Sequence, residues 1–153
     1  MKNVNSFHFR GYQKDNTHNF SQFANTLPKK LTKICLHGGF ERYFTISKFI
    51  KENVKSLKEL CFYVSNINDD CFSKLLNEEG LNLKKIHFKF CHYLTNVAIF
   101  NLCDSQKGVE ELVLESCCGI TDVSIFSITQ NLRNLKFLKM TMFGSITNVS
   151  NLV

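Results

Sequence analysis

Apolar residues recur at a fixed interval along this chain. A set with the spacing L-x-x-L-x-L begins at positions 31, 57, 83, 109 and 135, which gives the same 26-residue interval each time. The last two apolar residues of a set are two positions apart, as Leu112 and Leu114 are. Residues two apart lie on the same face of a strand, so each set predicts a short strand with one buried face.

A second apolar pattern follows the strands at the spacing of a helix. In two units it comprises Ile46, Phe49 and Ile50, and Phe72, Leu75 and Leu76. In the two most regular units, Val97, Ile99 and Leu102 match Val123, Ile125 and Ile128 position for position. Strands and helices that alternate with a period in the twenties are typical of leucine-rich repeats. We therefore predict an α/β fold, a leucine-rich-repeat solenoid of about six 26-residue units, wound as a right-handed βα superhelix with a parallel sheet on its concave face.

The two ends of the chain depart from this register. Residues 1–30 are predicted to form a degenerate N-terminal unit, with a strand one residue out of step and a helix over 17–27 that Pro28 ends. The sixth unit begins at Leu135, and the sequence stops before its helix could finish. We expect residues 1–153 to be one leucine-rich-repeat domain, either a fragment, a truncated product or the front of a longer protein.

Small polar residues recur where the chain should turn. Thr95, Thr121 and Thr147 are each followed by Asn or Asp at the expected start of a helix. A side-chain oxygen there can accept a hydrogen bond from a free backbone N–H, which stabilises the helix by about 1 kcal/mol. Cys91 and Cys117 occupy the expected inward corner after a strand. A thiol suits this corner because it is small, tolerates burial and donates weakly to a carbonyl.

The composition indicates a compartment and excludes some partners. Seven cysteines and no apolar stretch of the secretory type at the start predict reduced thiols in the cytoplasm or the nucleus. No apolar run approaches the ~20 residues needed to span a bilayer, so we expect no membrane partner. The net charge of +6 comes mostly from lysines that stand singly or in pairs, with arginine only at 10, 42 and 133. Such scattered charge favours a solvated surface over a nucleic-acid site.

The same register identifies the side chains of the concave face, which form three rows across the strands. The first row is Lys33, Glu59, Lys85, Glu111 and Phe137. The middle row is His8, Cys35, Cys61, His87, Val113 and Lys139. The last row is Arg10, His37, Tyr63, Lys89, Glu115 and Thr141.

These rows suit the docking of a protein or peptide, with the aromatic residues as possible anchors. The predicted binding residues are Lys33, His37, Glu59, Tyr63, Lys85, His87, Lys89, Glu111, Glu115, Phe137 and Lys139. The alternating charges of the first row also have a purely structural interpretation. Opposite charges on neighbouring strands support a sheet by roughly 0.2–1 kcal/mol per pair.

We expect no metal site and no active site in these rows. His8, Cys35, Cys61 and His87 are zinc-ligand types, but across four strands they spread over about 14 Å. A zinc ion holds its ligands within about 2.0–2.3 Å of itself. Only neighbouring members could share an ion, and no C-x-x-C pair supports one. The chain also has no nucleophile elbow, phosphate-binding glycine loop or H-E-x-x-H motif, so neither an enzyme nor a cofactor is expected.

The segment LVLESCCGITDVSIFSI resembles the cysteine-containing leucine-rich repeats of F-box/LRR proteins. The resemblance covers about residues 31–150 and weakens in the first two units, where Gly39 and Ser65 replace the cysteine. It implies a curved solenoid that recognises a protein substrate. In that family a separate F-box binds a Skp1-like adaptor, and the complex promotes ubiquitylation.

An F-box within this chain is not expected. The segment LPKKLTKICL superficially resembles the opening of an F-box, but Leu31, Ile34 and Leu36 are already explained by the 26-residue register. The resemblance therefore implies only the substrate-recognition part of an SCF-type ubiquitin ligase, with a Skp1-like adaptor as partner only if an F-box exists outside this chain. A stand-alone repeat scaffold without a ubiquitin link is the alternative.

Overall fold

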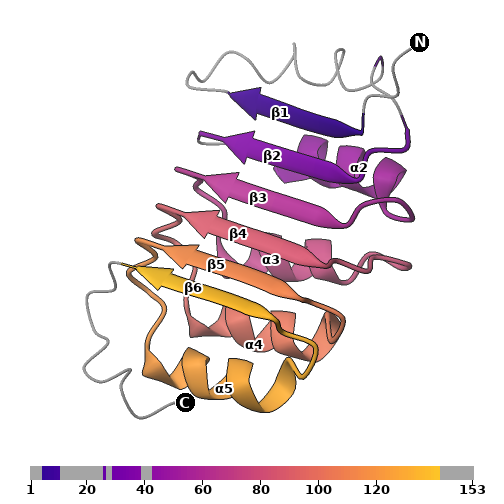
Figure 1. Ribbon diagram of the computed structural model, residues 1–153. Coiled ribbons are helices and arrows are strands. Elements are labelled where there is room, and N and C mark those ends of the chain that lie inside the picture. The colour runs from indigo at the N-terminus through magenta and orange to yellow at the C-terminus, as the bar shows by residue number, and fades with distance from the viewer. Residues whose placement is uncertain (1–4, 11–25, 27–28, 39–42, 142–153) are drawn as a thin grey trace.

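Six parallel strands form one open sheet within the part of the protein that this computed structural model describes, which is residues 5–10, 26, 29–38 and 43–141. The strands are β1 Ser6–Arg10, β2 Lys33–His37, β3 Glu59–Tyr63, β4 Lys85–Lys89, β5 Glu111–Glu115 and β6 Phe137–Thr141. They lie side by side in chain order, as Figure 1 shows. The predicted parallel sheet is confirmed.

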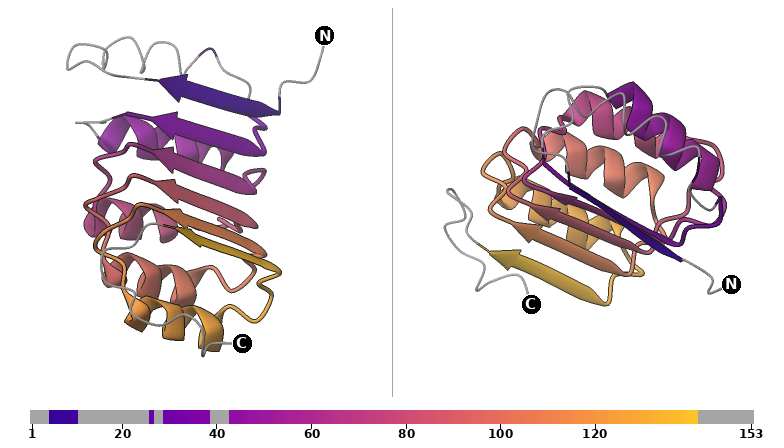
Figure 2. Two further views of the ribbon diagram at one scale, coloured as in Figure 1. Left: turned by 60° about the vertical axis from the view of Figure 1, so that its left-hand side comes forward. Right: turned by 90° about the horizontal axis from the view of Figure 1, so that it is seen from above.

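The described helices all cover one side of the sheet, which is clearest from above in Figure 2. They are α2 Tyr43–Asn53, α3 Asp69–Leu76, α4 Asn96–Ser105 and α5 Asp122–Asn131. Each connects two neighbouring strands, so strands and helices alternate as predicted. The arrangement is compatible with a repeat solenoid. No helix among the described residues is long and apolar enough to cross a membrane.

The register of the sheet follows the 26-residue interval. Strands β2 to β6 start at residues 33, 59, 85, 111 and 137, and each first residue pairs with the first residue of the next strand. Strand β1 starts at Ser6, which pairs with Lys33 and is one residue out of step, as predicted. The predicted helix over 17–27, the Ile46 side chain and the segment from Thr147 onward lie outside the described residues.

The core lies between the sheet and the helices. The second and fourth residues of β2 to β5 are buried, as strand alternation requires. Phe62 and Phe88 stack there with ring centroids 5.7 Å apart, and Phe72 of α3 meets Phe88 edge-on at 5.0 Å. Fully burying one such side chain contributes roughly 1.5–3 kcal/mol. The predicted helix residues Phe72, Leu75 and Leu76 are all buried.

The positional match between α4 and α5 extends to exposure. Ile99 and Leu102 are buried like Ile125 and Ile128, whereas the first members of each set, at positions 97 and 123, are at least half exposed. Both valines lie in the first turn of their helix on the side away from the sheet.

The helix starts are joined from one repeat to the next. Thr95 caps α4 as predicted, because its hydroxyl accepts from the Val97 N–H at 3.2 Å. The same prediction is wrong for Thr121, whose side chain makes no cap hydrogen bond. Its hydroxyl instead contacts the Asn96 side-chain amide, and Asn96 Oδ1 accepts from the Thr121 backbone N–H at 2.9 Å. The Thr121 hydroxyl therefore bonds to the previous repeat and does not cap α5.

A left-handed residue follows each of four strands. The residues are Gly38, Val64, Phe90 and Ser116, with φ of 101°, 51°, 55° and 53°. Each backbone N–H donates to the last carbonyl of the next strand, at 2.8 to 2.9 Å. After Phe90 and Ser116 the next residue turns inward, and Cys91 and Cys117 there are fully buried. We call these two positions the corner. The Cys91 thiol donates to the Phe62 carbonyl at 3.5 Å, which agrees with the predicted role.

Candidate functional site

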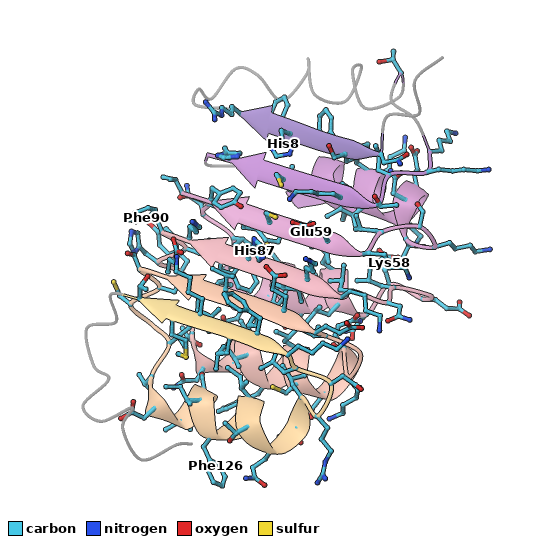
Figure 3. The ribbon with its side chains drawn as sticks, in the orientation of Figure 1. His8, Lys58, Glu59, His87, Phe90 and Phe126 are labelled. Carbon is cyan, nitrogen blue, oxygen red and sulfur yellow. The ribbon has the colours of Figure 1, made fainter. Side chains whose placement is uncertain are left out.

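The face of the sheet turned away from the helices is the candidate functional site, and we call it the open face. The first, third and fifth residues of each strand point to it because the second and fourth point into the core. Figure 3 shows His8, Glu59 and His87 on this side. The strand register aligns the three predicted rows across β1 to β6.

Ion pairs join strands along the first row. Lys33 of β2 pairs with Glu59 of β3, and Lys85 Nζ of β4 lies 2.7 Å from Glu111 Oε2 of β5. The hydrogen bond from Lys85 lowers the pKa of Glu111, and the bond to Glu59 raises the pKa of Lys33. Phe137 of β6 ends the row and is half exposed. The row therefore offers paired charges and one apolar side chain.

The middle row is more deeply placed than its neighbours. Cys35 and Cys61 are 0% exposed and Val113 is 5% exposed, although all three point to the open face. Longer side chains of the two flanking rows lie beside them, as Glu59 and Tyr63 lie beside Cys61. His87 is half-buried in the same row, and its Nε2 lies 2.9 Å from Glu111 Oε1. A hydrogen bond to Cys61 raises the pKa of His87, and the bond to Glu111 acts in the same direction.

The last row combines aromatic rings with a shared carboxylate. His37 and Tyr63 stack with ring centroids 4.4 Å apart, and Lys89 Nζ lies 5.8 Å from the Tyr63 ring centroid. Glu115 Oε2 lies 2.7 Å from Lys89 Nζ, and Glu115 Oε1 lies 2.6 Å from Lys139 Nζ. The hydrogen bond from Lys139 lowers the pKa of Glu115. Burial lowers the pKa of His37 and raises that of Tyr63.

The predicted binding residues thus form two connected groups. The first group is Lys33, Glu59, Lys85, His87 and Glu111. The second group is His37, Tyr63, Lys89, Glu115 and Lys139. Phe137 is paired in register with Glu111 at the edge of the sheet.

The structure brings together one set of donor atoms that the row-by-row sequence argument missed. The ligand atoms of Glu59, Cys61 and His87 all lie within 4.8 Å of one another. Glu59 belongs to the row beside that of Cys61 and His87, so the three residues do not lie in one row. The available signal was the tripeptide Glu59-Leu60-Cys61, since residues two apart on a strand share a face. Register then places His87 opposite Cys61.

Exposed apolar side chains at the ends of the strands were also missed. Val64 and Phe90 are about half exposed, and Tyr93 is 62% exposed. Phe90 projects from the end of β4 in Figure 3. The signal in the sequence is an apolar residue directly after the strand, where the chain must turn.

A hollow of about 400 Å³ lies near the end of α2 and is lined by four lysines. These are Lys29, Lys30, Lys51 and Lys55. Helix C-termini carry partial negative charge from their free carbonyls, which lysines stabilise. The hollow therefore has a structural explanation.

No known protein family matches this chain, and no curated protein is detectably similar to it in sequence.

Proposed function

We propose that this chain is a protein-binding leucine-rich-repeat module, with the sheet on the concave side of a right-handed superhelix. Its specific role is the substrate-recognition part of an SCF-type ubiquitin ligase of the F-box/LRR kind, acting in the cytoplasm or nucleus. The alternative is a stand-alone repeat scaffold without a ubiquitin link. Neither role makes the chain an enzyme or requires a cofactor.

The repetition of the same contacts supports the repeat assignment. The strand, the left-handed residue and the helix return at the same 26-residue interval in the regular units. The N–H of each left-handed residue meets the next strand at the same carbonyl position. Units that bury their apolar faces only against neighbours are the general property of solenoid proteins. The resemblance of the cysteine-containing units adds the F-box/LRR family to this argument.

The observation that carries the binding role is the open face itself. Seven ion-paired lysine and glutamate side chains and a stacked His37–Tyr63 pair lie on a rigid sheet that no described helix covers. The lysine side chains are 32% to 49% exposed. Aromatic and charged residues held on a rigid scaffold are the groups that anchor protein partners.

The charge pattern indicates the class of partner. Lys33 and Lys85 on this face each pair with their own glutamate, whereas Lys89 and Lys139 share Glu115, so four lysines meet three glutamates. Nucleic-acid binding depends on cations that neutralise phosphates, and lysines already paired with carboxylates serve this poorly. A partner with its own alternating charges could instead exchange with these pairs. A protein or peptide is therefore favoured over a polyanion.

Charge reversal on the open face tests the binding role. Partners of the full chain are captured by crosslinking and identified by mass spectrometry, and the capture is repeated with Lys85→Glu. The reversal places a carboxylate beside Glu111, so a partner that docks on this face is expected to be lost. Lys74→Glu on the exposed side of α3 is the matched control and should retain the partner. Equal capture by both variants would reject the open face as the binding surface.

The ubiquitin link needs a separate test. The complete open reading frame is inspected for an F-box, and its product is tested for co-purification with a Skp1-like protein. Both results positive support the ligase role. Failure of both rejects it and leaves the stand-alone scaffold. Salt-dependent binding to a generic DNA duplex would instead favour a nucleic-acid role.

A further inference from the structure

We propose that Glu59, Cys61 and His87 form a zinc-binding site on the open face. All three donor atoms lie within 4.8 Å of one another before any ion is present. Cys61 is buried, and Glu59 and His87 are half-buried, so the site lies close to the backbone of the sheet on the open face and not at the tips of exposed side chains. The four-membered middle row cannot share one ion, but these three residues occupy only two neighbouring strands.

The separations suit a tetrahedral ion. Zinc binds sulfur at about 2.3 Å and histidine nitrogen or carboxylate oxygen at about 2.0–2.2 Å, so the ligand atoms of one ion lie roughly 3.4–3.8 Å apart. The Cys61 Sγ to Glu59 Oε1 distance is 3.7 Å, already within that range. The remaining pairs need to close by at most about 1.4 Å, which side-chain rotation on fixed strands can supply. A water molecule would complete the tetrahedron.

The donor set favours zinc over other divalent ions. Thiolate, imidazole and carboxylate are the three ligand types that zinc accepts, whereas magnesium and calcium require oxygen ligands. A zinc ion with one thiolate, one carboxylate and a neutral imidazole has no net charge. Lys33 loses its partner Glu59 when the ion binds, and its side chain, which is 32% exposed, keeps its charge in contact with solvent.

Side chains around the site hold its ligands in place. Glu111 Oε1 lies 2.9 Å from His87 Nε2, and a carboxylate on one ring nitrogen fixes the histidine and leaves the other nitrogen to bind a metal. Lys33 pairs with Glu59, and Lys85 pairs with Glu111, so an ammonium faces each carboxylate. Lys33 pairs with Glu59 Oε1, the same oxygen that lies 3.7 Å from Cys61 Sγ, so the ion must displace Lys33 from that oxygen, which lowers the affinity.

Zinc uptake releases protons. The Cys61 thiol loses its proton to solvent as the zinc–sulfur bond forms, and any proton on His87 leaves as well. A hydrogen bond with the Cys35 thiol and burial raise the pKa of Cys61, and the pKa of His87 is also raised. The affinity is therefore expected to rise with pH.

Direct titration tests the site. The reduced, metal-free full chain is titrated with zinc chloride against a coloured chelator, and one zinc per chain is expected. Cys61→Ser and His87→Gln should each weaken binding by at least about 100-fold, because loss of a group that only hydrogen-bonds to a metal ligand already costs about 10–100-fold.

The matched controls are Cys118→Ser and His92→Gln. These residues are an exposed cysteine–histidine pair, with Sγ and Nδ1 3.6 Å apart. Both controls should retain full affinity. No zinc binding by the wild-type chain, or loss that follows Cys118 and His92, would overturn the proposal.

A second measurement does not depend on whether the variants fold. Cobalt(II) replaces zinc in the wild-type chain, and its absorption spectrum is recorded. A thiolate-to-cobalt charge-transfer band and the intense visible bands of a tetrahedral ion are expected. Cobalt that binds without the thiolate band would show that Cys61 is not a ligand and would reject the site.

Glu111 is a positioning residue for His87 in this proposal. Glu111→Gln is expected to weaken zinc binding by about 10–100-fold while the thiolate band of bound cobalt is retained. Unchanged zinc affinity in Glu111→Gln would remove Glu111 from the site.

Discussion

Two pairs of cysteines, each pair separated by one repeat, show how differently this fold uses the same side chain. Cys35 and Cys61 lie opposite each other on β2 and β3, and Cys91 and Cys117 occupy the corner after β4 and β5. All four are 0% exposed, and a thiol–thiol hydrogen bond joins each pair across the repeat. Burial and sequence spacing therefore do not distinguish them.

The neighbours of the thiols make the difference. The corner thiols meet backbone carbonyls, as Cys91 meets Phe62 and Cys117 meets Phe88. Cys61 instead lies among ionisable side chains, with Glu59 at 3.7 Å and His87 in hydrogen-bond contact. At the corner the thiols contact the backbone, whereas on the open face Cys61 contacts other side chains. Burial alone therefore does not show that a cysteine has only a structural role.

The largest expected effect comes from placing a charge at each position. Cys117→Asp buries a carboxylate among apolar groups and carbonyls, and should lower the free energy of unfolding by about 3–5 kcal/mol. Cys61→Asp should cost clearly less, because Lys33 and a protonated His87 can compensate the charge. Urea denaturation measures both, with the exposed Cys118→Asp as control. Equal losses of the free energy of unfolding in Cys61→Asp and Cys117→Asp would show that the two pairs of cysteines do not differ in this way.

A smaller effect, an increase in stability, is expected at the left-handed residue Val64. Val64 has φ of 51°, a conformation that costs a β-branched residue roughly 1–2 kcal/mol. Val64→Gly should therefore raise the free energy of unfolding by about 1 kcal/mol, even though Gly is favoured by the unfolded chain. Val97→Gly, at an equally exposed position in α4, should lower it. A loss in both variants would show that the left-handed turn is not strained.

Titration of His87 tests the side-chain chemistry of the open face. Its pKa in the folded protein is raised, so the stabilisation is fully present below about pH 6.5 and is lost as pH rises through the folded value. The metal-free chain should lose stability above that pH, and His87→Gln should show a shallower decline. Urea midpoints measured across pH 6 to 8 give the slope, with His92→Gln as control. Parallel slopes in wild type and His87→Gln would contradict the prediction.

The smallest effect is expected from Cys91→Ser. A hydroxyl can donate to the same carbonyls, and the fold already holds Ser65 at the equivalent corner after β3, where it is 3% exposed. The free energy of unfolding should change by less than about 1 kcal/mol, with no change in zinc affinity. Cys61→Ser carries the opposite expectation for zinc. A large loss of stability in Cys91→Ser would mean that the corner requires a thiol.

Much of the fold could be predicted from the sequence because apolar spacing alone defines a strand register. The positions of β2 to β6 follow from one interval, and the corner role of Cys91 follows from its place after a strand. The missing cap of α5 could not be predicted, because both hydroxyls also bond to the previous repeat, Thr95 to Asp69 and Thr121 to Asn96, and only Thr95 still caps its helix. Such competition depends on distances between repeats that spacing does not provide.

The candidate site could be predicted less well for a related reason. The register placed every open-face residue in its row, but binding chemistry runs diagonally between rows. Glu59, Cys61 and His87 meet only because two of them share a strand and the third lies opposite. Side-chain length and direction decide such contacts, and one-dimensional spacing carries neither.

The alternating charges of the first row restrict how a protein of this kind can lengthen by gene duplication. Copying one 26-residue unit within the array preserves the backbone hydrogen bonds between repeats, since each unit meets its neighbour in the same way. It would also set Lys beside Lys or Glu beside Glu, because Lys33, Glu59, Lys85 and Glu111 alternate. Copying two units together keeps both the backbone and the charge order. Duplication that keeps the charge order of the first row must therefore copy two repeats at a time, although one repeat is the structural unit.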